Sequence, residues 1–232
     1  MSIGTGSADT SGYVDRMLRI VPPPPAGETA EDSSEDLSED ERLVAALKAR
    51  LPGSIDALLA RHGNHLRRVL TRVLGAHDSE AADVLQDVTV SAWQSIGRLV
   101  DARALKAWLT QIAVFTARGV IRRRYRNRWL SFFESVPDAA QPWASPELHE
   151  AARAVYRIFD KMPADERIPF ALRMLEGLEL EATAEACGTS LATVRRRLVK
   201  AERRFHKLAR QSDALAPWMN EIVSAAAQGA KR

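Results

Sequence analysis

The spacing of the apolar residues is the feature that most constrains this fold. From about residue 42 onward they recur at steps of three and four, as they do along one face of an α-helix. No segment alternates apolar and polar residues as a half-buried strand does. We therefore predict an all-α protein, in which two small helical domains are joined by a flexible linker and preceded by a disordered N-terminus.

The first half of this pattern predicts three successive helices. The apolar stripe of the first comprises Leu58, Leu59, Leu66, Val69, Leu70, Val73 and Leu74. Gly75 closes this helix, and Asp78 with Ser79 can cap the next. The second helix directs inward Ala82, Leu85, Trp93 and Ile96. After a turn around Gly97, the third has a stripe of Leu105, Trp108, Leu109, Ile112 and Ile121.

Charge is strongly segregated along the chain, although the net charge is only +3. Segment 28–41 has eight acidic residues and no base, whereas 42–130 has a net charge of +10 and 151–211 of +5. Two basic modules suggest a polyanion such as nucleic acid. The alternative is a pair of solvated helical surfaces. We divide the chain into an acidic, proline-rich extension, a first module, a linker, a second module and a tail: 1–41, 42–130, 131–150, 151–211 and 212–232.

Several classes of protein are excluded. The single cysteine, Cys187, permits no internal disulfide and no multi-cysteine metal site. No apolar stretch is long enough for a transmembrane helix, and the N-terminus lacks a secretory signal, so we expect a cytoplasmic protein. His62, His65 and His77 lack a carboxylate set for a metal. We find no catalytic arrangement, and we predict no enzyme activity, no cofactor and no metal site.

The segment 179–204 has the spacing of a helix-turn-helix. Ala184 allows close helix packing, Gly188 permits a positive backbone angle in the turn, and Ser190 can cap the second helix. That helix has an apolar stripe of Val194, Leu198, Ala201, Phe205 and Leu208. Its opposite side carries Arg196, Lys200, Arg203 and Lys207, flanked by Thr193, Arg195 and Arg197. Such a helix fits the major groove of DNA, the alternative being a basic helix of a bundle. We expect Cys187 to be a core residue.

Two further patterns lie in the first module. Asp83, Gln86 and Asp87 share one face of the second helix and suit a basic protein partner, although acids near a helix N-terminus are favoured anyway. The third helix ends in an arginine cluster with interleaved aromatic residues: Arg118, Arg122, Arg123, Arg124, Arg126 and Arg128, with Tyr125 and Trp129. Arginines can bind phosphates and aromatic rings can stack on unpaired bases. Alternatively, Trp129, Phe132 and Phe133 pack in the core.

Taken together, these residues resemble the extracytoplasmic-function (ECF) group of bacterial RNA polymerase sigma factors. Segment 58–129 resembles their region 2, and 155–208 their region 4. The specific matches are Asp-Val-Leu-Gln-Asp-Val at 83–88, Trp93, Leu-Lys-Ala-Trp-Leu at 105–109, Ile112-Ala113, the arginines at 122–124, Met162-Pro163, Leu-Glu-Gly-Leu at 175–178 and the segment 190–198. The layout, with two domains and a short linker, is that of the ECF group.

The resemblance implies a factor that binds core polymerase, through the β′ clamp helices and the β flap, and recognises promoter DNA. It assigns Asp83, Gln86 and Asp87 to the clamp helices. The loop 97–103 would capture a flipped base of the minus-ten element, and the acidic linker would thread toward the RNA exit path. Minus-ten contacts and melting fall to Arg98, Arg103, Arg118, Arg122, Arg123, Tyr125 and Trp129. The minus-thirty-five element falls to the recognition helix 190–203, with Ser190, Thr193, Arg195, Arg196, Arg197, Lys200 and Arg203. An anti-sigma factor is a possible further partner.

The chain departs from the family pattern at five positions. Thr89 replaces a usual Phe, Phe115 and Gly119 replace Asn and Asp on the third helix, and Thr183 replaces Ile. Pro169 is expected to interrupt a normally continuous helix. These departures predict an unusual promoter preference. Two other functions stay open at this point: a helix-turn-helix regulator that never joins polymerase, and an adaptor that has kept the fold but lost promoter recognition.

Overall fold

The computed structural model describes residues 33–75, 81–127 and 146–217, and within these ranges all regular structure is helical, as predicted. The predicted cap at Asp78 and Ser79, together with Trp129, Phe132 and Phe133, lies outside the described residues. Most of the tail and most of the predicted linker also lie outside them.

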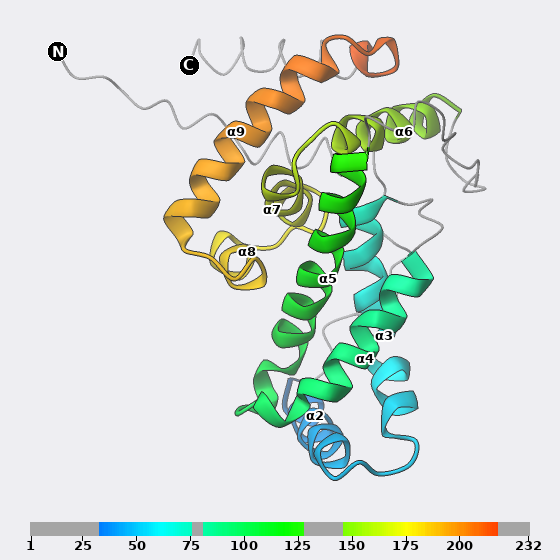
Figure 1. Cartoon of the computed structure of the whole chain (residues 1–232), viewed down its shortest axis with the longest axis vertical. Coiled ribbons are helices and arrows are strands. Elements are labelled where there is room, and N and C mark those ends of the chain that lie inside the picture. The colour runs from blue at the N-terminus through cyan, green and yellow to red at the C-terminus, as the bar shows by residue number, and fades with distance from the viewer. Residues whose placement is uncertain (1–32, 76–80, 128–145, 218–232) are drawn as a thin grey trace, which may run out of the picture.

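Four α-helices form the first module (Figure 1): α2 (Ser33–Lys48), α3 (Ser54–Leu74), α4 (Ala81–Ser95) and α5 (Leu105–Asn127). Their apolar stripes meet in a common core, in which Leu66, Val69 and Leu109 are fully buried. The helix α3 ends where predicted, because Gly75 adopts φ 117°, which residues with a side chain rarely take. Two short 3₁₀ turns, Ile96–Arg98 and Ala102–Ala104, connect α4 to α5.

Two predictions for this module are wrong. Ala82 is exposed, since Val84 and Val88, four residues apart, take the inward positions of α4. The predicted disordered extension reached residue 41, but α2 already begins at Ser33. The acid-rich sequence does not predict a helix here, because the residues that pair with the acids of α2 come from another part of the chain. Asp40 accepts hydrogen bonds from Arg61 at 2.7 Å and pairs with His62 at 3.0 Å, both on α3.

The second module contains four more α-helices and a final 3₁₀ turn: α6 (Pro146–Asp160), α7 (Ala164–Met174), α8 (Leu180–Ala186), α9 (Leu191–Ala209) and Asp213–Leu215. An aromatic cluster forms its core. The ring centroid of Phe159 lies 5.8 Å from that of Phe170 and 6.3 Å from that of Phe205, in edge-to-face geometry. Contrary to expectation, Pro169 does not interrupt its helix. It lies in the second turn of α7, where it is buried and removes only one backbone donor.

The two modules are in contact, with α7 beside α3 and the C-terminal part of α5 (Figure 1). Arg167 of α7 is buried and donates hydrogen bonds of 2.7 Å to the backbone oxygens of Val73 and Leu74. Helix C-termini leave such oxygens without intrahelical donors, and they favour a positive charge. Asp160 accepts a third bond from the same guanidinium at 2.7 Å. The buried Arg167 therefore links the second module to the end of α3.

Candidate functional site

The helix-turn-helix forms as the sequence predicts. Gly188, at φ 60°, makes the turn between α8 and α9, and Ser190 is the N-cap of α9. The Ser190 hydroxyl accepts a hydrogen bond of 3.3 Å from the backbone N–H of Thr193. Val194, Leu198 and Ala201 are buried against the rest of the module. The apolar stripe of α9 is thus fully used in packing, which leaves its other side to solvent.

The exposed side of α9 is basic. Arg195, Arg196, Lys200, Arg203 and Lys207 are all exposed, as predicted for a surface that faces DNA. Arg197, which was predicted to share this surface, differs from these exposed residues. It is half-buried, and its Nη2 lies 3.6 Å from Asp165 Oδ1 of α7.

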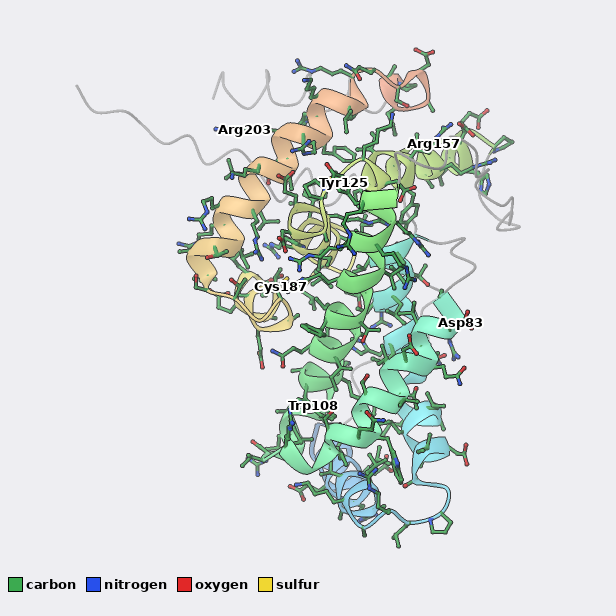
Figure 2. The ribbon with its side chains drawn as sticks, viewed as in Figure 1. Asp83, Trp108, Tyr125, Arg157, Cys187 and Arg203 are labelled. Atoms are coloured by element: carbon green, nitrogen blue, oxygen red, sulfur yellow. The ribbon has the colours of Figure 1, made fainter. Side chains whose placement is uncertain are left out.

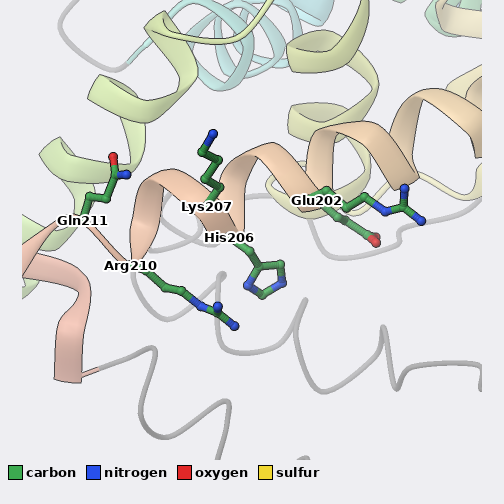
Figure 3. Close-up of a pocket in the computed structure, with 6 residues that line it drawn as sticks. Glu202, His206, Lys207, Arg210 and Gln211 are labelled. Carbon is green, nitrogen blue, oxygen red and sulfur yellow. The ribbon is translucent and has the colours of Figure 1, made fainter.

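Beside this basic face, the C-terminal half of α9 borders an open hollow (Figure 3), lined by Glu202, Arg203, His206, Lys207, Arg210 and Gln211. Partial burial raises the pKa of Glu202 and lowers the pKa of His206, whose pKa Arg210 lowers further. Three cations among the lining residues, Arg203, Lys207 and Arg210, make the hollow a basic extension of this face.

The acidic residues of α4 lie together as predicted. Asp83, Gln86 and Asp87 are exposed, while Val84 and Val88 hold the opposite face of the helix in the core. Asp83 lies on one side of the molecule and Arg203 on the other (Figure 2). The acidic surface of α4 and the basic surface of α9 are therefore separate surfaces.

The residues predicted for the minus-ten element form two separate groups. Arg98 and Arg103 are exposed just before α5 begins, whereas Arg118, Arg122, Arg123 and Tyr125 lie in its second half. With 23 residues, α5 is roughly 34 Å long. Trp108 and Tyr125 mark its two ends in Figure 2. A ligand that contacts both groups must run along this helix.

One residue that sequence reasoning missed, Asp165, binds arginines of both predicted DNA-binding helices. Its carboxylate lies 3.2 Å from Arg122 Nη2 and 3.9 Å from Arg118 Nε of α5, and 3.6 Å from Arg197 Nη2 of α9. In the sequence, Asp165 is only an acid in the first turn of a helix, a common preference. Its role depends on tertiary packing that periodicity does not encode.

Cys187 lies at this junction. Its backbone oxygen accepts a 3.0 Å hydrogen bond from Arg118 Nη2. Its side chain is buried, and burial raises the pKa of the thiol to about 11. Because the thiolate is the reactive form of cysteine, this raised pKa makes the side chain unreactive. Cys187 is therefore a core residue, as predicted.

Comparison with known proteins finds two family matches in the chain. Residues 58–130 match the family described as Sigma-70 region 2, and residues 152–205 match Sigma-70, region 4; together they span more than half of the chain. None of the described helices is both long and apolar enough to cross a membrane.

Named relatives and solved structures agree with these matches. The RNA polymerase sigma-H factor of Pseudomonas aeruginosa is 26% identical over 195 residues, covering 79% of this chain and 97% of that protein. The ECF RNA polymerase sigma factor SigM of Mycobacterium tuberculosis is 29% identical over 169 residues, covering 73% and 84%. The structure of CnrH with the cytosolic domain of CnrY superposes with a TM-score of 0.52 at 23% identity, covering 75% of this chain and 99% of that one.

The fold, with an acidic helix in one module and a helix-turn-helix in the other, defines a two-domain transcription initiation factor. The chain belongs to the sigma-70 family of RNA polymerase sigma factors, and within it to the ECF type.

Proposed function

We propose that this sigma factor contacts core RNA polymerase through the acidic surface of α4 and reads promoter DNA through α9 and α5. The observation that supports this assignment best is the placement of the two surfaces. The exposed acids of α4 belong to the first module and the exposed bases of α9 to the second, so the two surfaces stay distinct whether the modules are packed or separated. Polymerase and upstream DNA can then be held together without competing for a surface. The proposed role is binding and positioning, carried out in the cytoplasm where polymerase acts, and the chemistry of RNA synthesis belongs to the polymerase.

The minus-thirty-five element is assigned to the N-terminal half of α9. The first turns of a recognition helix reach base edges, while later basic residues meet phosphates. Ser190 and Thr193 lie at that end, followed by the exposed Arg195, Arg196, Lys200 and Arg203. Arg197 pairs with Asp165 of α7 within the second module, so we leave it out of the set that reads DNA.

The minus-ten element is assigned to the exposed length of α5 and the loop before it. The opened strand would run from Arg98 and Arg103 toward Arg118, Arg122, Arg123 and Tyr125. The charge supports this course, since arginines stand at both ends of the helix.

This function requires the two modules to separate. The centres of the two promoter elements are about 25 base pairs apart, or roughly 85 Å along the DNA axis at 3.4 Å per base pair. In the present arrangement one carboxylate, that of Asp165, lies within 4 Å of arginines on both α5 and α9. The packed form therefore represents the factor away from its promoter.

An anti-sigma factor is a further proposed partner. The superposing sigma factor RpoE of Bartonella quintana, at a TM-score of 0.52 and 24% identity, was solved with the anti-sigma factor NepR. That alignment covers 68% of this chain and 98% of RpoE. We propose that a comparable protein holds this factor until it is needed.

The polymerase contact is tested by reversing the charge of α4. The double variant Asp83→Lys, Asp87→Lys should weaken binding to core polymerase by at least tenfold, because like charges then face a basic partner. The measurement is a fluorescence titration of core enzyme with the full chain, with circular dichroism to confirm folding. Asp56→Lys with Asp213→Lys is the matched control, since both acids are exposed and lie elsewhere. Equal loss in both variants would refute the assignment of α4, and no binding by the wild type would favour a regulator that never joins polymerase.

A further inference from the structure

An aromatic ring lies exposed in the middle of α5. Phe115 is 73% exposed, although α5 buries apolar residues on either side of it in the sequence, including Val114 and Ala117. Ile112 and Trp108, one and two turns earlier on the same side, are half-buried and pack against the core. The ring therefore continues an apolar strip that the fold covers only in its first part.

On the face of α5 that carries Phe115, the next position of the helix is a glycine and carries no side chain. Gly119, four residues after Phe115, is exposed and has ordinary helical geometry, and a Cβ atom added there would meet nothing within 4 Å. Neither backbone conformation nor packing within the protein requires glycine, which is less favourable than alanine inside a helix. A helical side chain leans toward the N-terminus and covers the preceding turn. Glycine at 119 thus leaves uncovered the side of Phe115 that a longer residue would cover.

A positive charge follows directly. Arg122, seven residues after Phe115 on the same side of α5, has a side chain that is 58% exposed. Its partner in the packed form is Asp165, at 3.2 Å, which moves away when the modules separate. The exposed ring of Phe115, the glycine at 119 and the guanidinium of Arg122 then follow one another along one face of the helix. An unpaired nucleotide has matching parts, because its base stacks on an aromatic ring and its phosphate binds arginine.

We propose that Phe115 and Gly119 form a stacking site for one unpaired base of the opened promoter strand, with Arg122 on its phosphate. This inference rests on the proposed function and adds how the protein holds one nucleotide of the opened strand. Every base has a flat face, so stacking discriminates little between the four bases. The site therefore holds the opened strand at this position without selecting its sequence.

The test uses holoenzyme made from the full chain and core polymerase. The DNA is a bubble duplex of a promoter that the wild-type holoenzyme selects from a random library. Each unpaired nucleotide is replaced in turn by an abasic one or by the fluorescent base 2-aminopurine. At one position the abasic site should weaken wild-type binding by roughly 5- to 150-fold, and 2-aminopurine should be quenched there by stacking. The four natural bases at that position should bind within about threefold of each other.

The variants separate stacking from a structural effect. Phe115→Ala should weaken DNA binding by the same factor and lose the quenching of 2-aminopurine. In this variant the abasic site should cause no further loss of binding. Phe115→Trp should restore the binding, the quenching and the sensitivity to the abasic site. Gly119→Met, which favours the helix but covers the ring, should behave like Phe115→Ala. Leu51→Ala is the control, since Leu51 is 53% exposed and lies before α3, outside this strip and outside every surface assigned to DNA.

Two outcomes would overturn the proposal in different ways. Unchanged DNA binding by Phe115→Ala and Gly119→Met, with a wild type that binds well, refutes the stacking site alone and leaves the ring to a protein partner. Failure of the wild-type holoenzyme to bind any bubble DNA refutes the proposed function as well.

Discussion

Replacing Arg167 by methionine should open the contact between the two modules. The substitution keeps a long apolar side chain but removes the guanidinium, which donates to the backbone oxygens of Val73 and Leu74 and to Asp160. The two oxygens belong to the end of α3, and Arg167 belongs to α7. The two bonds to backbone oxygens therefore act between modules, whereas the bond to Asp160 of α6 lies within the second module.

The expected free-energy change is large for a single side chain. Each buried backbone oxygen left without a donor costs about 1–3 kcal/mol. The side chain of Asp160 is 53% exposed, so water replaces its lost partner at little cost. Methionine also avoids the cost of burying a charge, which offsets part of the loss. We expect a net change of about 3 kcal/mol, which lowers the ratio of packed to separated molecules by roughly a hundredfold.

Small-angle X-ray scattering measures this opening directly. The radius of gyration of Arg167→Met should rise above that of the wild type, while circular dichroism shows the same helix content. Arg157→Met is the matched control: Arg157 pairs with Glu150 on the surface of α6, with both side chains about half exposed. Such pairs contribute about 1 kcal/mol or less, so this variant should keep the wild-type radius. A wild-type radius in Arg167→Met would refute the role of this arginine in holding the modules together.

Two further predictions concern pH and promoter choice. Burial lowers the pKa of His65 from 6.5 to about 4, so below neutral pH the unfolded chain binds a proton that the folded chain does not. The free energy of unfolding should therefore fall by about 3 kcal/mol as the pH drops from 7 to 4. Urea unfolding of the wild type and His65→Gln at several pH values measures this, and an equal slope in both would contradict it. Arg196→Ala should relax selectivity at one upstream base pair by about 1–3 kcal/mol, whereas Lys207→Ala should weaken all sequences alike and reduce the salt dependence by about one phosphate contact. Holoenzyme titrations on a panel of promoter variants, at several salt concentrations, distinguish the two, and an even loss for Arg196→Ala would make it a phosphate contact only.

Local features were predictable from sequence because they depend on neighbouring residues. The turn at Gly188, the cap at Ser190 and the buried stripe of α9 follow from helix period and backbone preference, and the structure confirms each. The exposed acids of α4 follow from the same period.

Features that depend on packing between distant segments were not predictable. The sequence grouped Arg197 with the other basic residues of α9, but α7 brings Asp165 within 3.6 Å of it and leaves its side chain only 25% exposed. The helix α2 was missed because its acids become favourable only opposite Arg61 and His62 of α3. Both cases involve charged side chains. Whether such a charge stabilises or destabilises the fold depends on the partner that tertiary structure places beside it.

The most direct test of the central claim is run-off transcription with purified core RNA polymerase. Core enzyme should start transcription at a defined promoter only when the full chain is added, and the chain with Asp83→Lys and Asp87→Lys should not support it. Transcription that starts at the same site without the chain, or that the chain fails to stimulate despite binding the promoter, would contradict its assignment as a sigma factor.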